Sequence, residues 1–236
     1  MPAERAALIV VAAGAGTRLQ APRRKALVPL GGQPLVEHAL RRLLAVDWLA
    51  PVVLVGHPGD RAELTALLAR LPRPVTLVDG GARRQDSVLA GVRALPAAAE
   101  IVLVHDAARP FVPLERLAEL AAAARSLGAA LLAVPLADTV KQTREDDPQR
   151  SGGTLDRARL RAAQTPQAFR RAELVALLER AAERVVTDEA ALFEAAGFAV
   201  AFVEGSARNF KITTADDLGL AEALLAAEPH REKGRR

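Results

Sequence analysis

Two positively charged residues follow a glycine-containing loop near the start of the chain. Residues 8–40 read LIVVAAGAGTRLQAPRRKALVPLGGQPLVEHAL, with Arg18 in the loop and Lys25 a few residues later. Small residues let backbone N–H groups converge on an anion, and two cations beside them suit a triphosphate, whose α-phosphorus gathers negative charge on its oxygens when it is attacked. The spacing therefore predicts a phosphate site, with a tight turn and solvated surface cations as the alternative.

This loop does not match two common phosphate-binding motifs. The run GAGTRL places Leu19 where a dinucleotide-binding loop needs its third small residue. The residues that follow, LQAPRRK, lack the Gly-Lys-Ser/Thr of a P-loop. Gly14 and Gly16 alone are weak evidence, so the prediction depends on Arg18 and Lys25.

A carboxylate and a second arginine come at the end of a strand-like run later in the chain. Asp106 and Arg109 lie in EIVLVHDAARP, residues 100–110. They would lie at the edge where open α/β sheets place their ligands. A buried Asp–Arg pair that only fixes the loop is the structural alternative.

The composition argues against several other kinds of chemistry. The chain has no cysteine, which removes disulfides, thiolate metal sites and thiol nucleophiles, and its four histidines include no close pair that would build a zinc site. Lys and Arg total 32 against 28 Asp and Glu, and aromatic residues are 3%, so a nucleic-acid-binding surface is not indicated. No apolar run approaches the roughly 20 residues of a membrane span. Without a leader peptide before the first strand, we expect a cytoplasmic protein that makes no contact with membrane or nucleic acid.

The elements that must position these residues alternate along the chain. Runs rich in Leu and β-branched residues alternate with amphipathic stretches, which is typical of a mostly parallel sheet covered on both faces. The predicted strands are residues 6–14, 51–56, 74–81, 100–110, 128–140, 198–205 and 210–213. The predicted helices are residues 33–45, 59–71, 84–95, 113–128, 171–185, 188–197 and 215–227.

One polar segment interrupts this alternation. Residues 136–164 are polar, and their centre, REDDPQRSGG, consists of turn-forming residues between two short alternating stretches. We predict a protruding β-hairpin at about residues 137–162, which is either a plain loop or an arm that reaches a partner subunit. Because no repeat or low-complexity linker is present, we expect a single domain over residues 1–228, followed by a basic, disordered tail at 229–236.

Several motifs occur in order and resemble one family. They are VDGGARRQDSVLAG (78–91), VHDAARPFV (104–112), DTVK (138–141), LDR (155–157), QTPQAF (164–169), TDEAALFEAAG (187–197) and VEGSARNFKITTADDL (203–218). Together with AAGAGTRL and PLGGQPLVEHAL they resemble the 2-C-methyl-D-erythritol 4-phosphate cytidylyltransferases of the non-mevalonate isoprenoid pathway, over roughly residues 6–227. The resemblance implies a Rossmann-like, three-layer nucleotidyltransferase fold. It also implies transfer of a cytidylyl group from CTP to a polyol phosphate, with release of pyrophosphate.

The resemblance implies roles for the matching residues. The cations around the α-phosphate would be Arg18, Lys25 and Lys211. The CTP contacts would be Ala12, Ala13, Gly14, Ala15, Gly16, Gly81 and Ser87. The acceptor contacts would be Asp106, Arg109, Thr139, Arg157 and Thr165.

A metal ion and a partner chain are implied as well. Mg²⁺ is the expected metal, held mostly by substrate phosphates with Asp106 nearby. In the family the hairpin arm crosses to the other protomer, so the resemblance implies a homodimer in which each site borrows Arg157. Ser87 has a structural alternative, because a serine near the start of a helix often only caps it.

The chain departs from the family pattern at two places. Arg24 stands ahead of Lys25 where the family commonly has Pro-Lys, and we choose Lys25 by its spacing to PLGG. Arg208 stands where the family often has Asp, so Asn209 is the alternative for any role of that position.

Three other functions compete with this interpretation. A ribitol 5-phosphate cytidylyltransferase would share the fold and the chemistry, although Ala108 in HDAARP favours the methylerythritol enzymes. A hexose phosphate nucleotidyltransferase is disfavoured because HDAARP is not its pattern. A catalytically silent nucleotide-binding module is the third alternative, and the joint presence of Arg18, Lys25, Asp106 and Lys211 argues against it.

Overall fold

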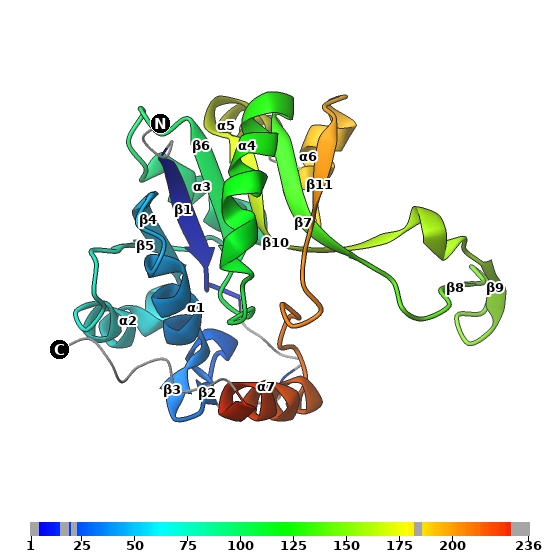
Figure 1. Ribbon diagram of the computed structural model, residues 1–236, viewed down its shortest axis with the longest axis horizontal. Coiled ribbons are helices and arrows are strands. Elements are labelled where there is room, and N and C mark those ends of the chain that lie inside the picture. Colours follow the sequence, from blue (N-terminus) through cyan, green and yellow to red (C-terminus); the bar gives the residue numbers. More distant parts are fainter. Residues whose placement is uncertain (1–4, 15–18, 20–22, 182–185, 228–236) are drawn as a thin grey trace.

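The protein folds as a seven-stranded sheet between layers of helices (Figure 1). The computed structural model describes residues 5–14, 19, 23–181 and 186–227. The predictions for Ala15, Gly16, Arg18 and the basic tail lie outside these residues.

The main sheet is mostly parallel, as the alternation of strands and helices predicts. Its strand order is β11-β7-β10-β6-β1-β4-β5, and β10 alone runs antiparallel to both of its neighbours. The bounds are β1 Ala6–Val11, β4 Leu49–Gly56, β5 Thr76–Asp79, β6 Ile101–Asp106, β7 Ala129–Pro135, β10 Arg161–Arg170 and β11 Val200–Glu204. The central strands are buried on both faces, which explains why they are continuous apolar runs.

Helices cover both faces of this sheet. They are α1 Leu35–Leu44, α2 Arg61–Leu68, α3 Arg84–Arg93, α4 Leu117–Leu127, α5 Arg171–Arg180, α6 Ala190–Ala195 and α7 Ala215–Ala227. Successive residues of β1 point to opposite faces, so Leu8 and Val10 pack with α1, α2 and α4, whereas Ala7 and Ile9 pack with α3, α5 and α6. A third, smaller cluster joins α7 to the segment before α1. The result is the predicted three-layer α/β fold, in which no described helix has the length and apolar character that a membrane span requires.

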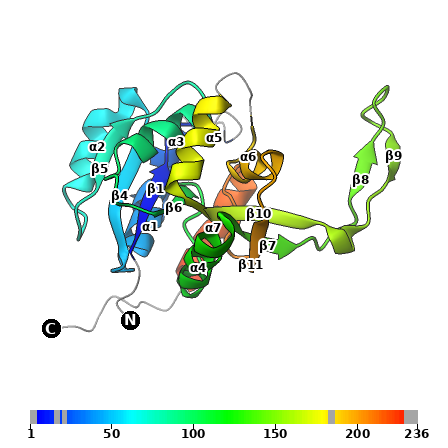
Figure 2. The ribbon, with the colours of Figure 1, turned by 90° about the horizontal axis from the view of Figure 1, so that it is seen from above.

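Two small hairpins lie outside the main sheet. β2 (Pro29–Leu30) and β3 (Gln33–Pro34) pair through a turn in which Gly31 and Gly32 have φ angles of 55° and 82°, a region that favours glycine. β8 (Lys141–Thr143) pairs antiparallel with β9 (Ser151–Thr154), and Figures 1 and 2 show this pair far from the main sheet. The segment that carries it leaves from the end of β7 and returns to the start of β10.

One predicted strand is wrong. Residues 210–213 form no strand, although their apolar and polar residues alternate. Phe210 and Ile212 instead pack into the small cluster below α7, and the amide of Ile212 donates a single backbone bond to the carbonyl of Ala108 at 2.9 Å. Thr213 then binds the Asp217 carboxylate at the start of α7 through its amide and hydroxyl, both at 2.7 Å. Local capping and packing therefore replace sheet pairing here.

Candidate active site

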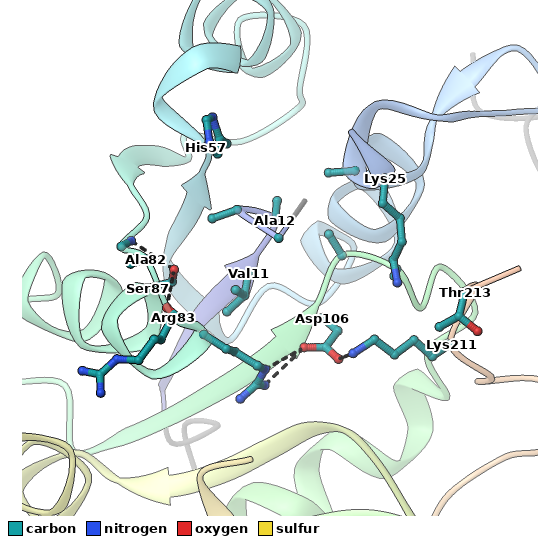
Figure 3. A pocket seen from close by; sticks show the side chains of 17 residues that line it. Val11, Ala12, Lys25, His57, Ala82, Arg83, Ser87, Asp106, Lys211 and Thr213 are labelled. Carbon is teal, nitrogen blue, oxygen red and sulfur yellow. Dashed lines mark hydrogen bonds and ion pairs between the residues drawn. The ribbon is translucent and has the colours of Figure 1, made fainter. Parts of the chain in front are cut away.

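A pocket of about 460 Å³ opens at the carboxyl ends of β1, β4 and β6. This is the edge where open α/β sheets bind their ligands. The lining residues come from the loop after β1, from the segment between β5 and α3, and from the segment before α7 (Figure 3). Of the residues predicted for the site, it contains Ala12, Ala13, Gly14, Lys25, Gly81, Ser87, Asp106 and Lys211.

The corner of the pocket at the start of α3 is built from backbone groups. Ser87 is buried, and its Oγ accepts from the amide of Gly81 at 3.1 Å and donates to the carbonyl of Arg83 at 3.2 Å. A Cβ on Gly81 would lie 2.4 Å from the Cβ of Asp86, so this close approach requires glycine. Ser87 therefore fixes the loop that presents its backbone polar groups to the pocket.

Lys25 and Arg24 point to different surroundings, although they are neighbours in the chain. Lys25 begins a short 3-10 helix, Lys25–Leu27, and its side chain extends toward Asp106 and Lys211 in Figure 3. Arg24 Nη1 instead donates to Oδ1 of Asp60 at 3.1 Å. The structure therefore places Lys25 in the pocket, and Arg24 is in an ion pair outside its lining.

Asp106 is the centre of the charged part of the pocket. Its Oδ2 accepts from Nζ of Lys211 at 2.6 Å, and its Oδ1 accepts from Nε and Nη2 of Arg84 at 3.3 and 3.2 Å. Burial alone would raise the pKa of Asp106, but the charges of Arg84, Lys211 and Arg109 hold it well below its usual range. Asp106 is consequently a carboxylate at neutral pH.

Thr165 and His105 hold the end of β6 from outside the pocket lining. Oγ1 of Thr165 accepts from the amide of Asp106 at 3.0 Å and lies 3.1 Å from Nδ1 of His105, whose Nε2 is 3.0 Å from the carbonyl of Arg109. The threonine hydrogen is therefore available to Nδ1, and Nε2–H donates to the carbonyl. Burial lowers the pKa of His105 to about 4, so the ring is neutral at neutral pH.

Arg109 and Asn209 connect the end of β6 to the segment that carries Lys211. Nη1 of Arg109 donates to the carbonyl of Asn209 at 2.7 Å. Asn209 is fully buried, and its Nδ2 donates to Oε1 of Gln164 at 3.1 Å and to the carbonyl of Thr165 at 2.9 Å. Arg109 therefore fixes the loop after β6, as the alternative of a structural Asp–Arg pair predicts. Its hydrogen-bond partner is the carbonyl of Asn209, in place of the Asp106 carboxylate.

The structure does not bring Thr139 and Arg157 to the pocket of their own chain. Both are exposed on the segment between β7 and β10, and Nη1 of Arg157 donates to the carbonyl of Ala137. Neither residue is among those that line the pocket, and the same holds for Arg109 and Thr165.

Two functional candidates in the site were missed by sequence reasoning. Arg84 opens α3 and binds Asp106, and Glu189 lies directly before α6 and binds Arg84. Both stand inside motifs that carry the family resemblance, which was the available signal. Their pairing joins residues that are 105 positions apart, so no local pattern predicts it.

A magnesium site built by the protein alone does not fit the pocket. Among the described residues, no group of three or more His, Asp or Glu side chains could hold a metal ion. Both oxygens of Asp106 already accept hydrogen bonds from cations. Asp106 as a metal ligand therefore stays a prediction.

Comparisons with known proteins agree on one family. The family model described as IspD, 2-C-methyl-D-erythritol 4-phosphate cytidylyltransferase, matches residues 6–227. A protein of that name from Prochlorococcus marinus is 41% identical over 93% of this chain and 97% of its own length. Another from Streptomyces coelicolor is 44% identical over 94% of this chain and 85% of its own.

Solved structures give the same result for the fold. The 4-diphosphocytidyl-2C-methyl-D-erythritol synthase of Anaerococcus prevotii superposes with a TM-score of 0.83 at 31% identity, covering 95% of this chain and 99% of the other. The 2-C-methyl-D-erythritol 4-phosphate cytidylyltransferase of Thermus thermophilus superposes with a TM-score of 0.75 at 34% identity, covering 94% and 99%. With a family match over nearly the whole length, a matching fold and a charged pocket at the expected sheet edge, this chain belongs to the 2-C-methyl-D-erythritol 4-phosphate cytidylyltransferase family.

Proposed function

We infer that this protein is a nucleotidyltransferase that transfers the cytidylyl group of CTP to 2-C-methyl-D-erythritol 4-phosphate, a step of isoprenoid precursor synthesis. The observation that carries the inference is the arrangement of Lys25, Lys211 and Asp106 around one pocket whose other wall is the Gly81 corner. In Figure 3 the two lysines lie on one side of the pocket and Ala82 and Ser87 lie on the other, with Arg83 and Arg84 also in the lining. Cations and backbone polar groups around one cavity suit a phosphate chain joined to a base.

The reaction needs little proton transfer from the protein. The acceptor phosphate is already ionised near neutral pH, so one of its oxygens attacks the α-phosphorus directly. A new P–O bond forms there while the bond to the β-phosphate bridging oxygen breaks, and pyrophosphate leaves with that electron pair. Positioning and charge stabilisation should therefore supply most of the rate enhancement.

Lys25 and Lys211 have the stabilising role in this mechanism, together with Arg18. The ammonium group of Lys211 is fixed by Asp106 at 2.6 Å, and the Lys25 side chain extends into the same pocket toward it (Figure 3). Negative charge that develops on the α-phosphate oxygens would meet cations already in place, which is the arrangement that lowers a barrier most.

Selection of cytosine is assigned to the corner formed by Gly81 and Ser87. Because Ser87 Oγ is engaged with Gly81 and Arg83, the loop is rigid and its backbone groups have fixed directions. A rigid hydrogen-bonding corner rejects a base with the wrong donors, since its own polar groups would be left unpaired.

Mg²⁺ is proposed as part of the substrate, in the form of the complex with CTP. Magnesium prefers oxygen ligands and is commonly held by substrate phosphates with one or two protein groups. Asp106 is the acidic residue among those that line the pocket, so it is the protein group assigned to the neighbourhood of the ion.

A homodimer is proposed because Thr139 and Arg157, which are assigned to the acceptor, do not line the pocket of their own chain. Thr139 and Arg157 lie on an exposed segment that extends away from the body of the molecule (Figure 2). Placed in the pocket of a second protomer, Arg157 would add a cation for the acceptor phosphate.

We assign the enzyme to the cytoplasm, where both of its phosphorylated substrates are made.

The test is pyrophosphate release with MgCTP and 2-C-methyl-D-erythritol 4-phosphate. D-ribitol 5-phosphate serves as the competing acceptor, and UTP and ATP serve as competing nucleotides. Release with CTP and the methylerythritol phosphate only is the expected result. A preference for ribitol phosphate would keep the mechanism and change the acceptor, whereas CTP binding without release by any pair would refute catalysis.

A further inference from the structure

Four charged side chains form a row that ends in the pocket. Arg84 Nη1 lies 2.5 Å from each carboxylate oxygen of Glu189. The other edge of the same guanidinium, Nε and Nη2, donates to Oδ1 of Asp106. Oδ2 of Asp106 is left for Lys211. The row of Glu189, Arg84, Asp106 and Lys211 alternates in charge and sums to zero, and Figure 3 shows Asp106 and Lys211 side by side.

Glu189 is the buried end of this row. Its side chain is 1% exposed, whereas that of Lys211 is 36% exposed. Burial raises the pKa of Glu189, and the Arg84 guanidinium opposes that rise. Burial acts to lower the pKa of Arg84, but the two carboxylates raise it, so Arg84 stays charged. A buried ion pair adds little net stability compared with apolar packing, so stability alone does not account for this one.

The segment that carries Glu189 is fixed independently of Arg84. Asp188 accepts from Nε2 of Gln167 on β10 at 2.9 Å and from the amide of Ala191 in α6 at 3.1 Å. The Glu189 carboxylate is therefore held at a set place behind Arg84, and Arg84 is the residue through which it can act on the pocket.

The two edges of the Arg84 guanidinium are divided between two carboxylates. Without Glu189, Nη1 and Nη2 of Arg84 could together donate to both oxygens of Asp106, because a bidentate pair is the strongest geometry for an arginine and a carboxylate. Lys211 would then share Oδ2 with a second cationic donor, and its own contact with Asp106 would weaken. We propose that Glu189 is a positioning residue that, through Arg84, reserves Oδ2 of Asp106 for Lys211. This proposal rests on the proposed function only for the identity of the acceptor.

The first experiment separates an effect on kcat from an effect on KM. Glu189→Gln keeps the shape of the side chain and removes its charge, and Asp188→Asn is the matched control that weakens the same segment without touching Arg84. We expect kcat to fall about 10- to 100-fold in Glu189→Gln, because Lys211 would be displaced from the charge that develops on the α-phosphate. KM for CTP should stay within about twofold, and Asp188→Asn should show neither change. A general loosening of the fold would instead raise both KM values together.

The second experiment does not depend on turnover. Acetylation of Lys211 by N-hydroxysuccinimide acetate is followed by mass spectrometry, with Lys141 on β8 as the internal reference. Loss of the contact with Asp106 should raise Lys211 labelling several-fold relative to Lys141 in Glu189→Gln, and leave it unchanged in Asp188→Asn. If Glu189→Gln does not fold, Glu189→Asp, which shortens the reach to Arg84, should show the same direction of change.

The outcomes of the two experiments are distinguishable. Unchanged Lys211 labelling in Glu189→Gln, or an unchanged kcat, would overturn the positioning role. An unmodified protein that releases no pyrophosphate would refute the proposed function, while Lys211 labelling would still decide whether Glu189 governs the contact.

Discussion

Removing the charge of Arg84 should destabilise the folded protein strongly. In Arg84→Gln, Asp106 keeps Lys211 as a partner, but Glu189 becomes a buried carboxylate that has lost its cation. Breaking a buried pair by removing one partner costs about 3–5 kcal/mol. For a chain of this size, each kcal/mol corresponds to about 2–4 °C, so Tm should fall by roughly 6–20 °C near neutral pH.

The loss of Tm in Arg84→Gln should also depend on pH, and the direction of that dependence can be derived. Burial raises the pKa of Glu189, and without Arg84 that rise is no longer opposed by its main counter-charge. The folded state then binds a proton that the unfolded chain has already released, so stability falls as pH rises from the unfolded pKa through the raised folded pKa. The Tm difference between the variant and the unmodified protein should therefore be larger at about pH 8 than at about pH 5.

Thermal unfolding followed by circular dichroism at both pH values tests this reasoning. Arg93→Gln is the matched control, because Arg93 pairs with Glu179 on the surface, where a single ion pair contributes about 0–1 kcal/mol. Adding Glu189→Gln to Arg84→Gln should restore most of the lost Tm, since no buried charge then lacks a partner. A deficit in Arg84→Gln no larger than in Arg93→Gln, or one that grows on acidification, would refute the argument.

Three further predictions concern catalysis. Lys25→Ala should lower kcat about 10²- to 10³-fold without a change in Tm, because it removes a preorganised cation. Arg24→Ala is the control and should retain most of the activity in the same pyrophosphate assay. Equal losses of activity in the two variants would contradict the assignment of Lys25. Gly81→Ala should raise KM for CTP about tenfold or more, since its Cβ would lie 2.4 Å from that of Asp86, and an unchanged KM would place the base elsewhere. Arg157→Ala should raise KM for the acceptor more than for CTP. Mixing Arg157→Ala with Lys25→Ala subunits should restore part of the activity, and no recovery would argue against a site shared between protomers.

Much of the fold could be predicted from the sequence because its signals are local. The buried strands are continuous apolar runs, and the helix that starts at Leu35 repeats its apolar residues at helical spacing. The strand predicted at residues 210–213 is absent because alternating apolar residues indicate only which side chains are buried. Packing against α7 produces the same alternation as burial in a sheet.

The site was predictable only in part, for a similar reason. Lys25 and Lys211 could be placed because each stands in a motif with its own spacing. The guanidinium of Arg109 donates to the carbonyl of Asn209, a contact across 100 positions that no local pattern predicts, and its contact with the acceptor stays a prediction. Which of two plausible partners an arginine binds depends on tertiary packing, and the sequence around it does not record that choice.

The reversed direction of β10 has a consequence for the route of the chain. In a sheet of parallel strands, every strand ends at the edge that carries the pocket, and the chain must cross back to the far edge before the next strand begins. Because β10 is antiparallel to β7, with Arg161 opposite Pro135, the chain can leave this edge and re-enter the sheet at the same edge. The segment between β7 and β10 therefore needs no crossover connection, and its length can vary without a change in the register of the strands. One reversed strand thus allows a long insertion between β7 and β10 at the sheet edge that holds the pocket.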